Sequence, residues 1–447
     1  MNGRKVHIVS LGCPKNQVDA EVMAALLSAH GSRIVDTPRD AGIIIVNTCA
    51  FILPAKEEAI EEILKMARYR EIGGLKHLIV TGCLAQRYGP DLAKEIPEAD
   101  LFLGMAEVPN IFDHIQTLDS GRTPAQRSVV RKPDFLMNAG HPRLLNRGLA
   151  TAYLKIAEGC SNRCSYCIIP SIRGALRSRT PADILREARR LADSGIREII
   201  LIAQDTTAYG RDLKKGGSGL PALIRKLSNI ANLDWIRLLY THPAHLTEDV
   251  LLAMAESEKV CRYLDLPIQH IDDAVLKAMN RRTDRHGIAN RIEKAREILP
   301  GVALRTSIIT GFPGETEARF HRLLDFIREI RFDHLGVFTY SREEGTRASL
   351  FASRISEREK QRRRDLLMAE QAFISHQINR SLIGSRQEVL IEGKSERPDY
   401  GFFGRCRRQA PEIDGITYVR GKNLKAGEIR TCTVGEAAEY DLFAEAS

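Results

Sequence analysis

Short apolar runs rich in β-branched residues recur in the first third of the chain. Three of these runs, at 6–12, 43–48 and 77–82, each end directly before a cysteine. Continuous apolar runs of this length are typical of strands that are buried on both faces of a parallel sheet. Helical patterns at 17–29 and 55–69 lie between the runs. The segment therefore predicts successive βα units with right-handed crossovers.

Six further strand-like runs alternate with helical patterns through the middle of the chain. They lie at 153–157, 198–203, 235–240, 263–268, 304–310 and 335–340. Thr180 and Pro181 fit the N-cap and first position of one intervening helix, and residues 315–330 repeat apolar positions with a helical period. Six βα units predict an open partial barrel, (βα)6, with its site at the carboxyl ends of the strands.

Alternation of apolar and polar residues replaces these patterns near the end of the chain. It occupies four runs separated by turn-rich stretches, at 387–392, 401–405, 416–419 and 430–434. This period of two predicts a small antiparallel β-barrel. The whole pattern predicts a multidomain α/β fold. We expect an N-terminal parallel α/β sheet domain at 1–135, the partial barrel with a helical linker at 145–380, and the small barrel at 381–447.

The composition is that of an ordinary globular protein. Of 447 residues, 43% are hydrophobic and 28% are charged, which is close to the usual balance. No apolar run approaches the roughly 20 residues of a membrane span, and the first residues enter a strand-like segment without a signal peptide's apolar stretch. We therefore expect a cytoplasmic protein with no membrane partner.

The net charge of +9 is unevenly distributed along the chain. An excess of this size is compatible with a nucleic-acid partner. It lies wholly in residues 136–380, because 1–135 and 381–447 each carry one more acidic than basic residue. Its densest runs are at 173–179 and 354–364. The second run is usually a solvated helix face, although contact with phosphates stays open.

Cys160, Cys164 and Cys167, which we call the loop trio, place three thiolates within eight positions. Iron–sulfur clusters are usually held by four Cys thiolates, so three of them around a [4Fe–4S] cluster leave one iron free for a substrate or cofactor. A catalytic zinc also keeps an open position on three protein ligands, although these usually include His or a carboxylate. A disulfide is less favoured, because nine cysteines are an odd number and cytosolic thiols stay reduced.

Cys13, Cys49 and Cys83, which we call the N-terminal trio, each follow a predicted strand. Ligands of open α/β sheets bind at the carboxyl ends of the strands, so the three thiols are expected to converge. A single such cysteine would usually be a buried structural thiol, but three at equivalent positions predict a second cluster with an open iron. The remaining cysteines have no ligand spacing and are expected to be structural: Cys261, Cys406 and Cys432.

The spacing CxxxCxxC resembles the signature of radical S-adenosylmethionine (radical SAM) enzymes. Combined with three dispersed cysteines on a small α/β domain, it resembles the methylthiotransferase family of that superfamily over nearly the full chain. The last segment resembles the TRAM domain. Five stretches resemble the ribosomal branch of the family, at 10–16, 47–52, 81–88, 173–179 and 410–415. The tRNA-modifying branch typically has Gln-Met after its first cysteine, where this chain has Pro14 and Lys15.

This resemblance implies a transferase that adds a methylthio group, CH3–S–, to the β-carbon of an aspartate in ribosomal protein S twelve. It implies two [4Fe–4S] clusters and S-adenosylmethionine as cofactors. The loop trio would hold the cluster that binds and cleaves S-adenosylmethionine, and the N-terminal trio would hold the cluster that supplies sulfur. The implied partners are the ribosomal protein or small ribosomal subunit, an electron donor such as flavodoxin or ferredoxin, and a sulfur source.

Other strand ends supply candidate cofactor contacts, none of which we assign as catalytic. They are Gln204 with Asp205, Gln269 with His270, and the loop at 311–315, which fits a turn as well as it fits a binding loop.

Two other functions stay open. A tRNA methylthiotransferase of the same family is supported by the basic middle segment, whereas the near-neutral last segment favours a protein substrate. A non-catalytic iron–sulfur redox protein fits less well, because electron carriers normally use four protein ligands.

Overall fold

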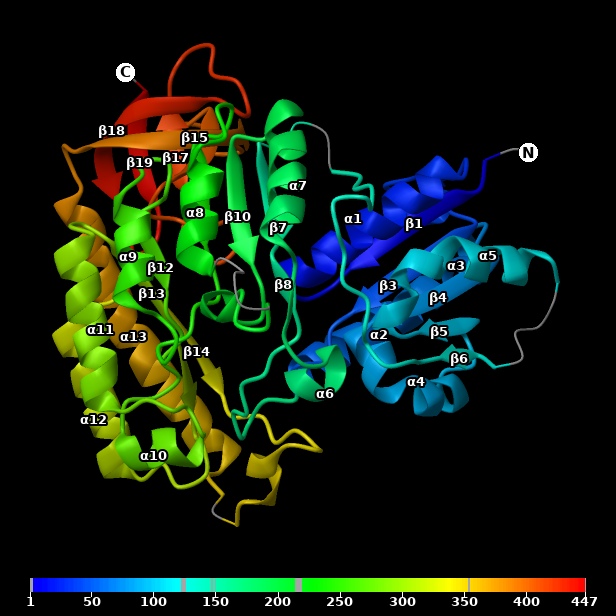
Figure 1. Cartoon of the computed structure of the whole chain (residues 1–447), viewed down its shortest axis with the longest axis horizontal. Coiled ribbons are helices and arrows are strands. Elements are labelled where there is room, and N and C mark those ends of the chain that lie inside the picture. The colour runs from blue at the N-terminus through cyan, green and yellow to red at the C-terminus, as the bar shows by residue number, and fades with distance from the viewer. Residues whose placement is uncertain are drawn as a thin grey trace. The chain divides into compact units, whose positions relative to one another are not determined.

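The chain packs into two compact units (Figure 1). The computed structural model describes residues 3–121, 126–145, 148, 150–213, 219–352 and 354–446. The first unit, here called the cysteine unit, comprises Met1–Leu145, Lys155–Arg179 and Ser341–Ser349. The second, here called the barrel unit, comprises Asn146–Leu154, Thr180–Tyr340 and Leu350–Ser447. Both cysteine trios therefore belong to the cysteine unit. The expected domain ranges 1–135, 145–380 and 381–447 stay predictions. Residues 1, 2 and 447, at the two ends of the chain, lie outside the described residues.

A six-stranded sheet in the order β2-β1-β3-β4-β5-β6 forms the centre of the cysteine unit. All five pairings are parallel, which confirms the predicted parallel sheet. The strands are β1 (Lys5–Ser10), β2 (Arg33–Ile34), β3 (Ile43–Thr48), β4 (His77–Gly82), β5 (Leu101–Leu103) and β6 (Ser128–Val129). The sequence pattern indicated β1, β3 and β4 only, because the other three are two or three residues long and carry no periodic signal.

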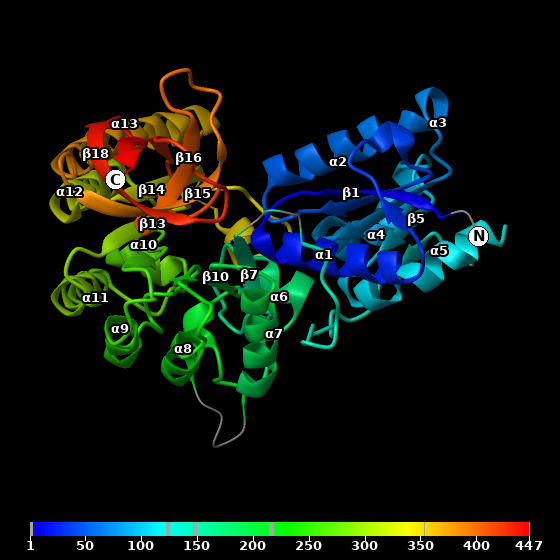
Figure 2. The ribbon, with the colours of Figure 1, turned by 90° about the horizontal axis from the view of Figure 1, so that it is seen from above.

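Helices cover both faces of this sheet, with α1 on one side and α2 on the other (Figure 2). The helices are α1 (Pro14–Ala29), α2 (Leu53–Ala67), α3 (Tyr69–Ile72), α4 (Cys83–Glu95) and α5 (Ile111–Asp119). Every residue of β3 is buried, which explains its unbroken apolar run. The apolar residues of α2 pack with β3 and β4 into one core.

The segment that carries the loop trio joins the same core. It contains β8 (Ala157–Glu158), α6 (Ile169–Arg173) and β9 (Arg177–Ser178), and β8 pairs with β9 antiparallel. Ile168 and Ile172 are buried in the core built on β3, β4 and α2. These apolar contacts explain why the segment packs within the cysteine unit.

Two three-stranded sheets supply the six strands of the predicted partial barrel, in the orders β11-β10-β7 and β12-β13-β14. The strands are β7 (Thr151–Lys155), β10 (Glu198–Ile202), β11 (Trp235–Leu238), β12 (Tyr263–Asp265), β13 (Ala303–Thr310) and β14 (His334–Thr339). The pairs β10–β11, β12–β13 and β13–β14 are parallel. All six correspond to the runs read from the sequence.

The helices of the barrel unit begin at recognisable caps. Thr180 accepts a hydrogen bond from the N–H of Asp183 and Pro181 opens the helix, which confirms the predicted start. Ser356 caps the long α13 in the same way. The helices are α7 (Pro181–Asp193), α8 (Leu220–Ser228), α9 (Glu248–Ala255), α10 (Asp273–Ala278), α11 (Arg285–Ile298), α12 (Glu317–Ile330) and α13 (Glu357–Ser381).

The last segment is a closed barrel in the order β15-β16-β17-β19-β18. Its strands are β15 (Arg386–Lys394), β16 (Phe402–Cys406), β17 (Thr417–Arg420), β18 (Ile429–Ala437) and β19 (Leu442–Ala446). Four were predicted, and β19 was missed. This strand pairs antiparallel with β18 but parallel with β17, so the barrel is antiparallel except at that one pair. Among the described residues, no helix combines the length and apolarity needed to span a bilayer.

Candidate metal centres

The N-terminal trio lies where three neighbouring strands end. Cys13 is the N-cap residue of α1, Cys49 directly follows β3, and Cys83 is the first residue of α4 after β4. Gly12 has φ +88°, and a Cβ there would lie 2.7 Å from the Cβ of Cys49. Only glycine therefore lets the chain before Cys13 pass this close to Cys49.

Asn16 fastens these strand ends together. Its side-chain amide donates to the carbonyls of Leu11 and Thr48, each at 2.9 Å. Its backbone carbonyl accepts from Asn47 Nδ2 at 2.7 Å. Its Oδ1 accepts from Cys83 Sγ at 3.9 Å. The side chain is fully buried, so these bonds replace all of its water contacts and hold the loops that carry the three thiols.

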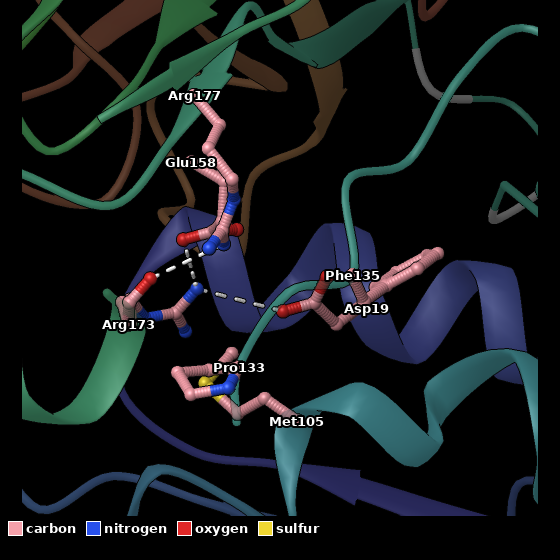
Figure 3. Close-up of a pocket in the computed structure, with 7 residues that line it drawn as sticks. All are labelled: Asp19, Met105, Pro133, Phe135, Glu158, Arg173 and Arg177. Atoms are coloured by element: carbon pink, nitrogen blue, oxygen red, sulfur yellow. Dashed lines mark hydrogen bonds and ion pairs between the residues drawn. The ribbon is translucent and has the colours of Figure 1, made fainter. Parts of the chain in front are cut away.

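Arg173 is a buried cation beside these thiols, and Figure 3 shows its guanidinium between Glu158 and Asp19. The residue is only 1% exposed. Its Nη2 donates to Asn16 Oδ1 at 2.5 Å and to Cys83 Sγ at 3.5 Å. Its Nη1 donates to Glu158 Oε1 at 2.9 Å. The guanidinium therefore joins a thiol of the N-terminal trio to a carboxylate that lies two residues before the loop trio.

A second buried cation completes a four-charge network. Lys155 Nζ donates to Asp19 at 2.5 Å and to Glu158 at 3.0 Å. Arg173 lies 3.7 Å from the other oxygen of Asp19. Burial alone would raise the pKa of Glu158, but the charges of Arg173 and Lys155 lower it far below its usual range. Two cations and two carboxylates thus lie together in one buried network.

The three N-terminal thiols lie close enough to influence one another electrostatically. Burial raises the pKa of Cys83 to about 12, with Cys49 and Cys13 adding to the rise and Arg173 opposing it. Burial also raises the pKa of Cys49. For Cys13 burial is outweighed by the charges of Lys15 and Arg173, so its pKa is lowered. The predicted convergence of the trio is therefore present, with Arg173 acting on all three thiols.

The loop trio is held by backbone contacts and is partly exposed. Cys160 donates its N–H to the carbonyl of Gly174 at 3.0 Å, and its Sγ accepts from the N–H of Asn162 at 3.4 Å. Ser165 accepts from the N–H of Ala348 at 2.8 Å. Gly174 directly follows Arg173 in the chain. Gly174 contacts Cys160 of the loop trio, and Arg173 contacts Cys83 of the N-terminal trio.

The spacing of the thiols tests which metal they fit. Around a tetrahedral zinc with Zn–S of about 2.3 Å, two thiolates lie about 3.8 Å apart. Among the described residues, one group of three possible ligands has its ligand atoms within 4.8 Å of one another, and it contains neither trio. In neither trio, therefore, do all three thiols lie within 4.8 Å of one another. Soft, all-thiol donor sets of this kind suit iron–sulfur clusters.

A small pocket opens beside the charged network (Figure 3). The empty space there, open solvent included, is about 220 Å³. The network supplies Asp19, Glu158 and Arg173 to its lining, and apolar contacts come from Met105, Pro133 and Phe135, with Arg177 completing the wall. The apolar side chains cover Arg173 on this side and limit its contact with water.

Comparisons with known proteins show which family the chain belongs to. Three family models match the chain: the radical SAM superfamily at 154–327, the uncharacterised protein family UPF0004 at 5–104, and the TRAM domain at 383–446. The ribosomal protein uS12 methylthiotransferase RimO of Syntrophus aciditrophicus (strain SB) is 59% identical over 448 residues, covering 100% of this chain and 99% of its own. The chain belongs to the RimO family of radical SAM methylthiotransferases.

Further relatives support the same assignment. The RimO of Geobacter sulfurreducens is 49% identical, covering 99% of this chain and 98% of its own. The structure of the radical SAM methyltransferase TsrM from Kitasatospora setae, with cobalamin and a [4Fe–4S] cluster bound, has a TM-score of 0.56 at 15% identity over 86% of this chain and 80% of that chain; this likeness concerns the fold alone. Membership of the radical SAM superfamily implies S-adenosylmethionine and a [4Fe–4S] cluster as cofactors.

Two of the other strand-end candidates resolve as structural features. The N–H of Gly311 donates to Glu315 Oε2 at 2.7 Å, and a Cβ at Gly311 would lie 2.2 Å from Lys360 Cγ. The loop is therefore a turn closed by its own carboxylate and covered by α13. His270 is fully buried, accepts from the N–H of Asp272 at 3.0 Å, and has its pKa lowered by burial to about 3. It is a neutral histidine of the core.

The remaining cysteines and the basic runs are also accounted for. Cys261, Cys406 and Cys432 are buried, as expected of structural thiols. Arg173 and Arg179 of the first basic run are each 1% exposed. In the second run Arg363 bonds Glu315 at 2.8 Å and Glu359 at 2.7 Å. Arg173 and Arg363 thus neutralise carboxylates within the fold, and Arg179 donates to the carbonyl of Lys155 at 2.7 Å. These internal contacts weaken the argument from net charge for a nucleic-acid partner.

Sequence reasoning missed the network that surrounds the thiols. Asn16, Asp19, Lys155 and Glu158 were not singled out, and Arg173 was counted only as part of a basic run. A signal was present, because Lys155 interrupts the apolar stretch at 152–157 that leads to Cys160, and Glu158 directly follows that stretch. A charge in a strand that reads as buried implies a buried partner, but the sequence does not say which residue that partner is.

Proposed function

We propose that the protein transfers a methylthio group to the β-carbon of an aspartate in ribosomal protein uS12, with one [4Fe–4S] cluster on each cysteine trio. Its full-length relatives bear the name of that activity. The observation that carries the proposal is the convergence of three strand-end thiols on one buried guanidinium. Structural thiols need no such cation, whereas a thiolate-bound cluster carries negative charge that a buried site must compensate.

The division of labour follows from the two donor sets. When bound, the cluster on the loop trio supplies the electron that cleaves S-adenosylmethionine, and the cluster on the N-terminal trio supplies the sulfur that is methylated and transferred. The chain holds these groups by its thiolates and orients the N-terminal trio through Asn16. Arg173 keeps a fixed positive charge at the thiols, and the buried salt bridges of Lys155 and Glu158 hold Arg173 in place.

The small barrel, which matches the TRAM domain, favours a protein substrate rather than tRNA. Its most basic stretch uses its arginines internally: Arg405 bonds Glu198 at 2.7 Å, Arg407 bonds Glu388 at 2.7 Å, and Arg408 bonds Asp333. RNA affinity depends on Lys and Arg that meet phosphates. We place the reaction in the cytoplasm, with uS12 or the small ribosomal subunit as substrate, an electron donor such as flavodoxin or ferredoxin, and a separate sulfur source.

Mass spectrometry of cells with and without the gene tests the substrate. We expect uS12 from cells that contain the protein to carry the added methylthio group on one aspartate, and tRNA modification to be the same in both strains. A methylthio mark that appears on tRNA while uS12 stays unmodified would overturn the choice of substrate and leave the chemistry standing.

Iron content and variant enzymes test the two-cluster proposal. The anaerobically reconstituted protein should hold about eight iron per chain, in two clusters of four. Cys164→Ala should abolish 5′-deoxyadenosine release from S-adenosylmethionine, whereas Cys49→Ala should keep that release and lose methylthio transfer. Four iron per chain after full reconstitution, or equal loss of cleavage in both variants, contradicts two separate clusters.

A further inference from the structure

The segment Ser341–Ser349, here called the strap, packs in a different unit from the chain on either side of it. The strand β14 precedes the strap and the helix α13 follows it, and both belong to the barrel unit. The strap itself belongs to the cysteine unit, together with both cysteine trios. The part of the chain that builds the barrel unit thus contributes one segment to the unit that carries the thiols.

Glu343 binds the strap to the helices α2 and α4 of the cysteine unit. Its Oε2 accepts from Lys56 Nζ of α2 at 2.8 Å and from Arg87 Nη1 of α4 at 2.7 Å. Its Oε1 accepts from Ser341 Oγ at 2.7 Å. The residue is 1% exposed. Burial would raise the pKa of Glu343, but these three hydrogen bonds outweigh it and lower the pKa. An ionised carboxylate therefore lies between two cations.

Arg87 links the strap to the strand ends that carry two thiols of the N-terminal trio. It lies one helical turn after Cys83, the first residue of α4. Its Nη1 also donates to the carbonyl of Ala50 at 3.2 Å, and Ala50 directly follows Cys49. Its Nη2 donates to the carbonyl of Glu344 in the strap at 2.8 Å. One guanidinium therefore fastens the strap beside both of these cysteines.

The later residues of the strap contact the loop trio. Ala348 donates its N–H to the carbonyl of Ser165 at 2.8 Å. Ser165 is 1% exposed and directly follows Cys164. A Cβ at Gly345 would lie 3.3 Å from Cδ1 of Ile168, which directly follows the last cysteine of the loop trio. The strap therefore touches the chain just beyond two of the three cysteines.

Hydrogen bonds within the strap hold these two sets of contacts at a fixed separation. Arg342 Nε donates to the carbonyl of Ser349 at 2.9 Å. The carbonyl of Glu343 accepts from the N–H of Thr346 at 3.2 Å and from its Oγ1 at 2.6 Å. Glu343 and Thr346 are buried, and paired polar groups in a buried segment make it rigid. The strap is therefore a rigid spacer.

The strap is also a second link between the two trios. The first link is the pair Arg173 and Gly174, which contact Cys83 and Cys160. A single link would leave the loop trio free to pivot about it. Two links at separate points fix the distance between the trios and their orientation together.

We propose that the strap sets the spacing between the two cysteine trios, with Glu343 as its positioning residue. The inference rests on the proposed function, in which a radical made at the loop trio and sulfur held at the N-terminal trio must meet at one carbon of the substrate. A misplacement of about 1 Å can lower a rate about a hundredfold. The spacing therefore matters for methylthio transfer, whereas cleavage of S-adenosylmethionine needs the loop trio alone.

The test replaces Glu343 by Gln in the full-length, reconstituted enzyme. The amide keeps the shape of the side chain but loses the charge that holds Lys56 and Arg87. We expect 5′-deoxyadenosine release to stay near that of the wild type, while the amount released per methylthio group transferred rises about tenfold or more.

EPR spectroscopy of the enzyme with both clusters reduced gives a second readout that does not depend on turnover. The magnetic interaction between two paramagnetic clusters falls steeply with the distance between them. We expect the splitting that this interaction causes to be reduced or broadened in Glu343→Gln, because the strap no longer holds the trios at one spacing.

Three further variants control for general damage. Glu344→Gln removes the same charge from the neighbouring residue, which is exposed and bonds Arg87 through its backbone carbonyl, so neither readout should change. Glu343→Asp keeps the charge and should keep part of the coupling between cleavage and transfer. Lys56→Met removes one of the two cations, from a side chain that is 17% exposed. It should shift both readouts in the same direction by less, and it replaces Glu343→Gln if that variant does not fold.

Each other outcome contradicts the proposal in a recognisable way. A lower melting temperature in Glu343→Gln, with the wild-type product ratio and the wild-type EPR splitting, would give the strap a purely structural role and overturn the inference alone. Equal loss of cleavage and transfer would do the same. A wild-type enzyme that holds only about four iron per chain after full reconstitution would overturn the two-cluster proposal and this inference with it.

Discussion

Each unit contains a buried arginine beside a buried cysteine, and the two pairs have different surroundings. In the cysteine unit, Arg173 contacts Cys83 and acts on two more thiols. In the barrel unit, the fully buried Arg237 lies near Cys261, whose pKa burial raises to about 11 while Arg237 opposes the rise. An arginine next to a thiol is therefore not enough to indicate a metal centre. The number of converging thiols makes the difference.

The barrel-unit pair belongs to a structural network instead. Glu198 of β10 accepts from Arg237 at 2.8 Å and from Arg405 of the small barrel at 2.7 Å. All three residues are at most 1% exposed. Its Oε2 fastens the small barrel to the sheet through Arg405, and its Oε1 bonds Arg237 of the neighbouring strand β11. One network thus positions thiols and the other joins two layers of the fold, although both are built from arginine and glutamate.

Replacement of Cys83 or Cys261 should give the largest difference between the two arginine–cysteine pairs. Cys83→Ala removes one of three ligands, so we expect iron to fall from about eight to about four per chain and methylthio transfer to be lost. Cys261→Ala, the matched control, should keep all of its iron and its activity and lose only some stability. Iron and activity assays on the two purified variants check this, and equal iron loss in both would remove the distinction between the pairs.

Replacement of the arginines sharpens the comparison with a spectroscopic readout. Arg173→Gln takes a positive charge away from the thiolates, which favours the more oxidised cluster. We expect a more negative midpoint potential for that cluster by EPR-monitored titration, with methylthio transfer reduced about tenfold or more. Arg173→Lys should restore part of the potential because it keeps the charge.

Arg237→Gln is the control for that experiment. It should lower the melting temperature and leave both midpoint potentials unchanged. If Arg173→Gln and Arg237→Gln lower stability alike and neither moves a potential, Arg173 has only a structural role.

Loss of the buried ion pair should mainly affect stability. Arg405→Met leaves Glu198 with one cationic partner, Arg237. Loss of one member of a buried ion pair costs about 3–5 kcal/mol in the free energy of unfolding. Chemical denaturation measures it, while 5′-deoxyadenosine release from the folded fraction should stay near that of the wild type. Removal of residues 381–447 would expose the same carboxylate, so point variants test substrate docking more cleanly than deletion does.

The smallest expected effect is the pH dependence of the unfolding free energy that the ion pairs of Glu198 contribute. Burial raises the pKa of Glu198, but Arg405 and Arg237 outweigh it and lower the pKa from 4.5 to about 2. A lowered folded-state pKa stabilises the protein above the unfolded value, and that stability is lost as pH falls from about 4.5 towards 2. The difference in unfolding free energy between wild type and Glu198→Gln should therefore shrink over this range, and a constant difference would contradict the assignment.

The sequence by itself determined most of the strands and helices, and it showed that the candidate ligands are thiols. Unbroken apolar runs such as 43–48 can be satisfied only by strands buried on both faces, so the positions of Cys13, Cys49 and Cys83 at strand ends could be read directly. The spacing of the loop trio is local, because a few residues of chain fix how far apart its thiols lie. The missed strand β19 carries a weaker alternation, and its parallel partner β17 is 21 residues away in the chain.

Only the tertiary structure decided which charges meet. Arg173 and Cys83 are 90 residues apart, Lys155 and Asp19 136, and Arg405 and Glu198 207. The periodicity of the sequence indicates whether a position is buried. It does not indicate which buried cation pairs with which buried carboxylate, because that depends on how the elements pack. The same packing placed Arg173 beside the thiols of the candidate metal centre and Arg237 in a structural joint.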